Sequence, residues 1–257
     1  MYAVGRIPGG YLKREARPSE KGTLTARMID RPIRPGFVDG FKHEVHVVTT
    51  TLVADHTNPI DTICVAGASA SLMLASAPFD GPVACVRVGR DKDTGDFICN
   101  PTYQEQENSD LDLVIAGTTE YISMIEAGGE EIAEEDMLAA MSFGQTAIAE
   151  FCAAQQRFLD KCTIEKKEWS IHVPDASIAE RVDPFFDEMS AALKDADKQA
   201  RMSKVDELKA RIKAEKFTEE ELSAWSADIA AALKSLEKHA MRRMIIETGE
   251  RADGRKA

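Results

Sequence analysis

One break in composition divides this chain into two parts. Residues 176–246 contain one proline and no glycine, and they are rich in alanine, lysine and glutamate. Because glycine and proline are the residues that most destabilise a helix interior, this stretch suits long, uninterrupted helices. The residues before Cys162 instead alternate short apolar runs with turns. The sequence therefore predicts a small all-helical domain after a domain of strands and helices, with a linker over 161–174.

Two capping boxes support the helical prediction. They are Ser177-x-x-Glu180 and Thr218-x-x-Glu221, and in such a box the hydroxyl and the carboxylate satisfy free N–H groups at the start of a helix. The second box opens an apolar stripe at helical spacing, which consists of Leu222, Trp225, Ile229, Leu233 and Leu236. We expect one helix to begin at Thr218 and to carry this stripe on one side.

The first 160 residues predict a mixed α/β domain. The β-branched run over 44–54 favours a strand, and the small apolar residues 62–75 favour a helix packed against a sheet. Residues 5–40 are rich in Gly, Pro and Arg and predict only one or two helical turns at 24–29. The remaining pattern predicts a hairpin from 83–88 and 97–99, strands over 111–116 and 121–125, and a long helix over 131–158.

The net charge of −12 argues against a simple nucleic-acid binder, but the charge is unevenly distributed. Residues 1–36 carry eight Lys and Arg against three Asp and Glu, which leaves them at +5 and the rest of the chain at −17. Such a segment can contact an anionic partner. It can equally be an ordinary charged surface, so charge alone leaves both interpretations open.

Three features bear on the compartment. No apolar run approaches the roughly 18 residues that a membrane-spanning helix needs. The N-terminus lacks the charged and then apolar layout of a signal peptide. The five cysteines are odd in number and form no Cys-x-x-Cys, so neither a disulfide framework nor a zinc ribbon is indicated. We therefore expect a cytoplasmic protein with no membrane partner.

Two acids are weak candidates for metal binding. Asp110 and Asp112 flank the start of the strand predicted at 111–116, where carboxylates can bind a metal ion at the mouth of a sheet. Exposed acids also keep edge strands soluble, so the pair has an ordinary alternative.

The basic N-terminal stretch indicates a nucleic-acid contact. Gly9-Gly10-Tyr11-Leu12-Lys13-Arg14 places an aromatic ring beside two cations, which suits the bases and phosphates of a single strand. Arg31-Pro32-x-Arg34-Pro35 adds two guanidinium groups on a stiff backbone, suited to phosphate oxygens. The alternative is structural ion pairing of these cations with Glu15, Glu20 and Asp30.

Ordered motifs along the chain carry a family resemblance. They are Gly5-Arg6-Ile7-Pro8-Gly9-Gly10-Tyr11-Leu12-Lys13-Arg14-Glu15, Ile29-Asp30-Arg31-Pro32-Ile33-Arg34-Pro35, Gly67-Ala68-Ser69-Ala70, Pro78-Phe79-x-Gly81-Pro82 and Leu111-Asp112-Leu113-Val114-x-Ala116-Gly117-Thr118. In this order they resemble the first RNase PH-type domain of bacterial polynucleotide phosphorylases. The acidic stretch after residue 165 is similar to that family's interdomain helical domain, and Gly249-Glu250-Arg251-x-Asp253-Gly254-Arg255 looks like the opening of its second RNase PH-type domain.

The resemblance implies a fold and a domain order. Residues 1–162 would form an N-terminally incomplete RNase PH-type domain with the α/β (α+β) fold of the ribosomal protein S5 domain 2-like class. Residues 163–247 would form the all-helical interdomain domain, and residues 248–257 would start the second RNase PH-type domain. The chain would then be a fragment, with opening strands expected before Met1 and the second phosphorolytic, KH and OB-fold domains expected after Ala257.

The resemblance also implies an activity. The family is a homotrimeric ring that threads single-stranded RNA through a central channel, and it takes part in RNA-degradation complexes. It degrades mRNA from the 3′ end with inorganic phosphate, releases nucleoside diphosphates and uses Mg²⁺ or Mn²⁺. The parent protein is therefore expected to be a polyribonucleotide nucleotidyltransferase.

The family's RNA-binding positions map onto few residues of this chain. Tyr11, Leu12, Lys13 and Arg14 match its channel loop, where Leu12 replaces an aromatic residue and both charges remain. Arg31 and Arg34 match basic positions of the same domain, and for these two RNA contact and a structural role both stay open.

The resemblance places no catalytic residue in this segment. The family's phosphate cradle is a Gly-Ser-Ser stretch, and the equivalent residues here are Asn58-Pro59-Ile60-Asp61-Thr62. Asp112 aligns with a metal-binding aspartate, but Val114 stands where a lysine is expected. We therefore expect no metal ion on this segment and no phosphorolysis by it alone. Its expected role is RNA-channel binding and trimer scaffolding, and the alternative is a wholly non-catalytic module for RNA binding and ring assembly.

Overall fold

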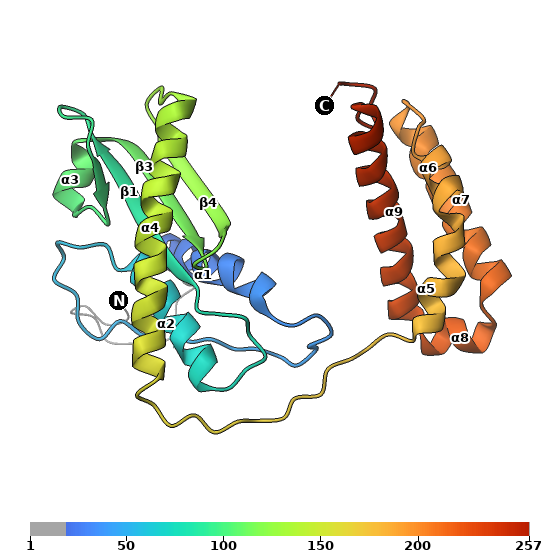
Figure 1. Ribbon diagram of the computed structural model, residues 1–257, viewed down its shortest axis with the longest axis horizontal. Coiled ribbons are helices and arrows are strands. Elements are labelled where there is room, and N and C mark those ends of the chain that lie inside the picture. Colours follow the sequence, from blue (N-terminus) through green and yellow to red (C-terminus); the bar gives the residue numbers. More distant parts are fainter. Residues whose placement is uncertain (1–18, 257) are drawn as a thin grey trace, which may run out of the picture. The chain divides into compact units, whose positions relative to one another are not determined.

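The computed structural model describes residues 19–256 and divides the chain into two compact units (Figure 1). The first unit extends to His172, and the helical unit begins at Val173. Tyr11, Leu12, Lys13 and Arg14 lie outside the described residues.

A four-stranded antiparallel sheet forms the centre of the first unit. Its strands are β1 (Ala84–Asp91), β2 (Phe97–Cys99), β3 (Ser109–Gly117) and β4 (Ile122–Gly129), in the spatial order β2-β1-β3-β4. The Asp91 carboxylate accepts hydrogen bonds at 2.9 Å from the N–H groups of Asp93 and Thr94 and so closes the β1–β2 turn. The predicted hairpin, the two later strands and the mixed α/β class are confirmed.

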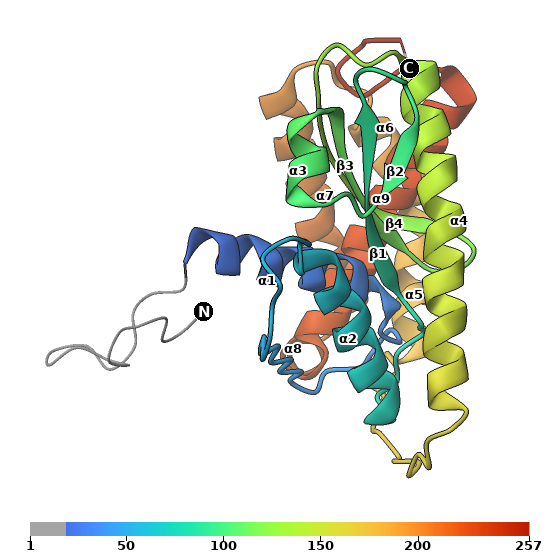
Figure 2. The same ribbon diagram turned by 90° about the vertical axis from the view of Figure 1, so that its left-hand side faces the viewer.

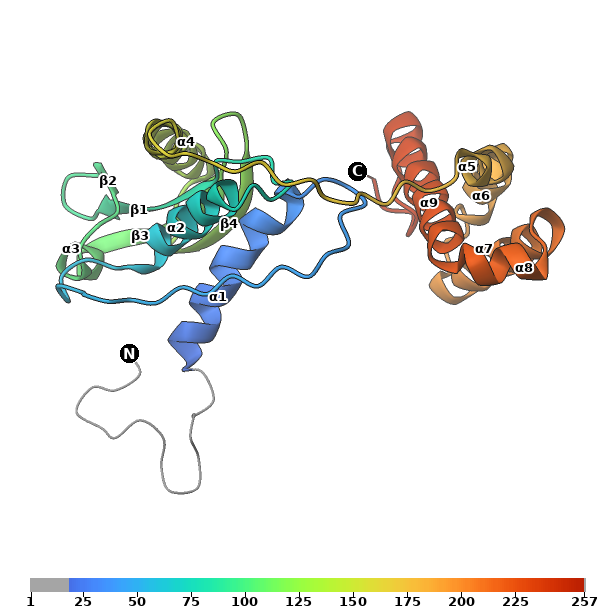
Figure 3. The same ribbon diagram turned by 90° about the horizontal axis from the view of Figure 1, so that it is seen from below.

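Helices cover both faces of this sheet (Figures 2 and 3). On one face α4 (Glu134–Leu159) packs against alternate residues of β1 and β3, and on the other α1 (Glu20–Ile33) and α2 (Asp61–Leu74) pack. Helix α4 lies close to the sheet at Gly144, where an added Cβ would come within 2.5 Å of Ile115 Cδ1. Although α4 is long and apolar enough to cross a membrane, its apolar stripe packs on the sheet. The predicted helices over 62–75 and 131–158 are confirmed.

Helix α1 is longer than the one or two turns predicted at 24–29. The Ser19 hydroxyl accepts a hydrogen bond from the Gly22 N–H at 3.1 Å and so starts the helix at Glu20. Pro32 lies in the last turn, where it removes one hydrogen bond to the carbonyl four residues earlier. Burial of Met28, Ile29 and Ile33 against the sheet side of the core then stabilises the whole helix. Tertiary packing therefore outweighs the local effect of proline.

The strand predicted over 44–54 is wrong, because these residues carry no regular secondary structure. A strand needs a neighbour to receive its N–H and C=O groups, and no strand among residues 19–256 pairs with this segment. Val48, Leu52 and Val53 are correspondingly exposed. The segment follows a short 3₁₀ turn (Arg34–Gly36) and leads into α2, and a short helix, α3 (Tyr103–Glu107), precedes β3.

The predicted linker packs against the first unit as far as His172. The indole Nε1 of Trp169 donates a hydrogen bond to the Ser76 carbonyl at 2.7 Å, and its ring meets that of Phe41 edge-on at 5.5 Å. His43 Nε2 lies 2.9 Å from Ser170 Oγ. Residues 163–172 therefore pack as part of the first unit although they form no helix or strand.

The helical unit has a core of its own. Its elements are α5 (Ala176–Val182), a 3₁₀ turn (Asp183–Phe185), α6 (Phe186–Ala192), α7 (Lys198–Lys216), α8 (Glu219–Ala224) and α9 (Ser226–Thr248). Side chains from all of these except α8 form one buried cluster, and Leu222 of α8 packs at its edge. Gly249, with φ of +65°, ends α9 in the left-handed conformation. The predicted all-helical domain is confirmed.

The two predicted capping boxes differ in outcome. The Thr218–Glu221 box is present, and Thr218 Oγ1 accepts from the Glu221 N–H at 3.2 Å. The Ser177 box is wrong, because Asp175 caps α5 two residues earlier by accepting from the Ser177 N–H. The single helix expected from Thr218 is divided at Trp225, whose backbone leaves the helical region between α8 and α9.

Candidate functional site

Arg31 and Arg34 lie on α1, and each has an acidic partner. Arg34 binds the Asp30 carboxylate with two nitrogens, with Nη2 at 2.7 Å from Oδ1 and Nε at 3.1 Å from Oδ2. Arg31 Nη1 lies 3.4 Å from Glu126 Oε2 of β4. The sequence suggested the ion pair with Asp30 but not the ion pair with Glu126. All four side chains are at least 43% exposed, and such pairs contribute only about 0–1 kcal/mol. A phosphate could therefore displace either acid at low cost.

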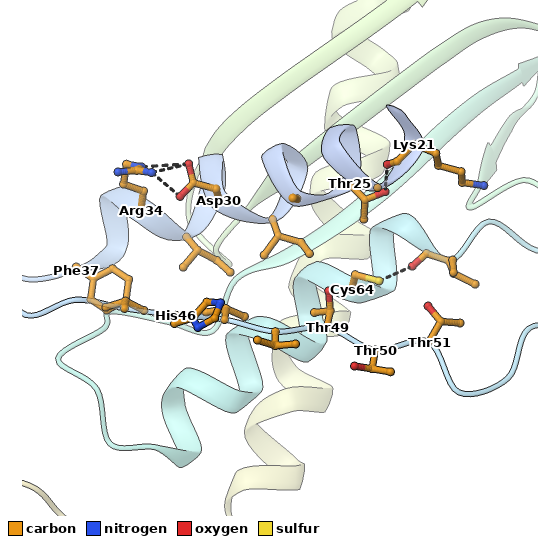
Figure 4. Close-up of a pocket in the computed structure, with 18 of the residues that line it drawn as sticks. Lys21, Thr25, Asp30, Arg34, Phe37, His46, Thr49, Thr50, Thr51 and Cys64 are labelled. Carbon is orange, nitrogen blue, oxygen red and sulfur yellow. Dashed lines mark hydrogen bonds and ion pairs between the residues drawn. The ribbon is translucent and has the colours of Figure 1, made fainter. Parts of the chain in front are cut away.

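An open groove runs between α1 and the segment that the sequence assigned to a strand (Figure 4). Its volume is about 1370 Å³, and Ile29, Ile33 and Phe37 form part of its apolar lining. Threonines 49–51 line it as well, with Lys21 and Arg34 among its cations. Among the residues that the structure describes, this mixture of apolar and hydroxyl groups offers no cluster of cations for an anion.

Cys64 is the thiol in the groove, but it is unsuited to nucleophilic chemistry. Its Sγ donates to the Ile60 carbonyl at 3.1 Å. Burial, with a smaller effect from the nearby Asp61 carboxylate, raises the pKa of the Cys64 thiol. The thiolate that nucleophilic attack requires is therefore disfavoured.

Asp112 is joined to Asp61 through one arginine. Arg87 of β1 places Nη1 at 2.6 Å from Asp112 Oδ1 and Nη2 at 2.8 Å from Asp61 Oδ2. Arg87 and Asp61 are each 13% exposed, whereas Asp112 is 57% exposed. Arg87 thus bridges β3 and the first turn of α2. We call these three residues the Asp61–Arg87–Asp112 network.

This network occupies the place that the resemblance aligns with a phosphate cradle. Asp61 is the first residue of α2, and its carboxylate accepts from the Thr62 N–H at 3.0 Å. The start of a helix attracts negative charge, and here the chain's own carboxylate supplies it. A phosphate at this point would be repelled by Asp61, so the geometry favours a closed structural ion network over an anion site.

Neither acid that the sequence proposed for a metal is grouped with other ligands. Within residues 19–256 no cluster of three or more His, Cys, Asp and Glu side chains could hold a metal ion. Asp112 contacts Arg87, while Asp110 contacts Arg90 at 2.7 Å. The hydrogen bond from Arg90 is the main cause of a lowered pKa of Asp110. The sequence analysis did not identify Arg87 and Arg90 as partners of these acids. The only signal for them was the presence of charged residues within an otherwise apolar strand.

Comparison with known protein families gives three successive matches. Residues 1–78 match domain 1 of the 3′ exoribonuclease family, and residues 81–147 match domain 2 of that family. Residues 177–256 match the RNA binding domain of polyribonucleotide nucleotidyltransferase. The first two matches fall on the first unit and the third on the helical unit.

Individual relatives are similar over the whole chain. A polyribonucleotide nucleotidyltransferase of Listeria welshimeri is 40% identical over 100% of this chain and 36% of its own length. One of Hyphomonas neptunium is 44% identical over 99% of this chain and 36% of its own length. The chain thus spans little more than a third of these relatives. Among solved structures, rice (Oryza sativa) Rrp46 is similar at a TM-score of 0.37 and 16% identity, over 41% of this chain and 50% of that chain.

Proposed function

We propose, on the premise that this chain belongs to the 3′ exoribonuclease family, that it is part of a phosphorolytic 3′-to-5′ exoribonuclease. In that reaction an oxygen of inorganic phosphate attacks the last phosphodiester of an RNA, the bond to the preceding 3′ oxygen breaks, and a nucleoside diphosphate leaves. The observation that carries the proposal is the order of the three family matches, together with about 40% identity to polyribonucleotide nucleotidyltransferases along the whole chain.

Within such an enzyme, we assign this segment to RNA-channel binding and ring assembly. Tyr11, Leu12, Lys13 and Arg14 would grip single-stranded RNA in a homotrimer, with Arg31 and Arg34 as further cations. Mg²⁺ or Mn²⁺, an RNA-degradation complex and a cytoplasmic location belong to the proposal for the whole enzyme. The accessible positions of Arg31 and Arg34 on α1 support a role in binding an anion.

The segment is proposed to lack phosphorolytic activity of its own. The support is the Asp61–Arg87–Asp112 network, which places a carboxylate at the start of α2. We expect the 257-residue chain to release no nucleoside diphosphate from poly(A) in the presence of phosphate and Mg²⁺. A full-length polyribonucleotide nucleotidyltransferase serves as the positive control, and phosphate-dependent release by the purified chain would overturn the prediction.

RNA binding tests the proposed channel residues. We expect the chain to bind a fluorescent single-stranded oligo(A) in a salt-sensitive way, and the variant Lys13→Ala/Arg14→Ala to bind more weakly. Loss of two phosphate contacts should reduce the slope of log affinity against log salt by about 1.4. The matched control is Lys166→Ala/Lys167→Ala, which removes two exposed cations elsewhere. Equal slopes for the two variants would refute the role of Lys13 and Arg14.

A further inference from the structure

Helix α9 presents a row of three exposed cations to solvent. Lys234, Lys238 and Arg242 are all exposed, and their spacing of four residues places them on one face of the helix. At a rise of 1.5 Å per residue they follow one another at intervals of about 6 Å along the axis. We call these three residues the α9 basic row.

Neighbouring acids are already engaged elsewhere. Glu237 binds Lys209 of α7 at 2.6 Å, and Glu247 binds Arg243 at 2.7 Å. Within the part of the chain that the structure describes, the α9 basic row forms no ion pair or hydrogen bond through its side chains. The row therefore keeps its full positive charge available to a partner.

The helical unit as a whole is not basic. Residues 173–257 contain 16 Lys and Arg against 18 Asp and Glu. Many of the other cations of the unit are neutralised within it, as Lys204 is by Asp195 and Arg181 by Glu221. The α9 basic row is thus a positive strip on an otherwise slightly acidic surface, which indicates a partner with regularly repeated negative charge.

We propose that the α9 basic row binds the phosphodiester backbone of single-stranded RNA. A nucleic-acid strand carries one negative charge per nucleotide, and evenly spaced Lys and Arg neutralise such a chain with release of its counterions. The row lies inside the region that matches a domain described as RNA binding. Backbone contacts of this kind carry no sequence information, so binding should be indifferent to base sequence. The inference rests on the proposed function, because it assumes that this chain binds RNA.

A triple variant tests the inference. Lys234→Gln, Lys238→Gln and Arg242→Gln are combined in the full 257-residue chain, and binding of a fluorescent oligo(A) is titrated from 50 to 200 mM salt. Loss of three contacts should lower the slope of log affinity against log salt by about 2, with a loss of affinity on the order of 10- to 100-fold at low salt. An oligo(U) of the same length should lose affinity to the same extent.

The matched control removes the same charge from scattered positions. Lys194→Gln, Lys198→Gln and Lys213→Gln alter three exposed cations of the helical unit that also lack an acidic partner among residues 19–256. We expect this control to keep the parental slope. Far-ultraviolet circular dichroism should be the same for both triple variants, since every substituted side chain is exposed.

The outcomes separate this inference from the proposal on which it rests. If the parental chain binds no RNA at 50 mM salt, the proposed RNA role itself fails. If the parental chain binds but the α9 variant keeps its slope, only the inference fails. Equal losses in the α9 variant and the control would show a general charge effect and would also overturn the inference.

Discussion

Replacing Arg87 with methionine should lower the free energy of unfolding of the first unit by about 3–5 kcal/mol. Removal of one partner from a buried ion pair leaves the other charge buried and uncompensated. Here that charge is Asp61, whose side chain is 13% exposed and which loses its contact at 2.8 Å. Asp112 is more than half exposed, so water replaces its arginine partner at little cost.

Urea unfolding followed by fluorescence measures this loss. The chain has two tryptophans, and Trp169 packs on the first unit while Trp225 packs against the core of the helical unit. In a Trp225→Phe variant, the remaining tryptophan fluorescence therefore reports unfolding of the first unit alone. Arg34→Met is the matched control, because the Arg34 side chain is 75% exposed and its loss should cost about 1 kcal/mol or less. Equal losses at the two arginines would contradict a buried role for Arg87.

Adding Asp61→Asn to Arg87→Met should recover part of the lost stability, because the uncompensated charge is then removed. The comparison of the double variant with each single variant isolates the coupling between the two residues. Strictly additive losses would show that Arg87 acts through packing of its hydrocarbon stem rather than through Asp61.

The second large effect is expected in the helical unit. Ile212→Ala should destabilise it by about 2–5 kcal/mol, because Ile212 of α7 is fully buried in the core and its truncation leaves a cavity. The same substitution at Ile246 of α9, which is 82% exposed, should change stability by about 0.5 kcal/mol or less. Trp225 fluorescence in a Trp169→Phe background follows this unfolding transition.

The two units should respond separately to these changes. Their buried clusters share no residue, since one lies among α5 to α9 and the others surround the sheet. Ile212→Ala should therefore leave the urea concentration at the midpoint of the transition reported by Trp169 the same as in the parental chain. A shift of both transitions by the same amount would show that the units unfold as one.

Secondary structure was predictable wherever the local pattern agreed with the packing. The helices around residues 62–75 and 131–158 bury residues at helical spacing. The strand around 111–116 is a mainly apolar run that is buried on both faces. Both patterns can be read from the sequence. The prediction failed at residues 44–54 because a strand depends on a neighbour that local sequence does not specify. It fell short at α1, where burial of Met28, Ile29 and Ile33 supports a helix in spite of Pro32.

The candidate site was less predictable than the fold. The positions of Asp61 and Asp112 followed from motif order, but their common partner did not, because Arg87 is 26 residues from one and 25 from the other. The exposed cations of α9 gave no motif at all. Their spacing of four residues sets the row, but they stay exposed and without an acidic partner among residues 19–256 because the opposite side of the helix is buried and the adjacent acids pair with Lys209 and Arg243.

The sequence by itself determined the helices around residues 62–75 and 131–158, the strands of the sheet, where composition divides the chain and which family its motifs resemble. These properties depend on side-chain periodicity, capping and residue order, which are local or read directly along the chain. Only the tertiary structure decided that Arg87 joins Asp61 to Asp112 and that three cations of α9 find no partner among residues 19–256. Such charges meet or stay apart according to strand register and helix docking, which are set by burial between segments distant in the sequence.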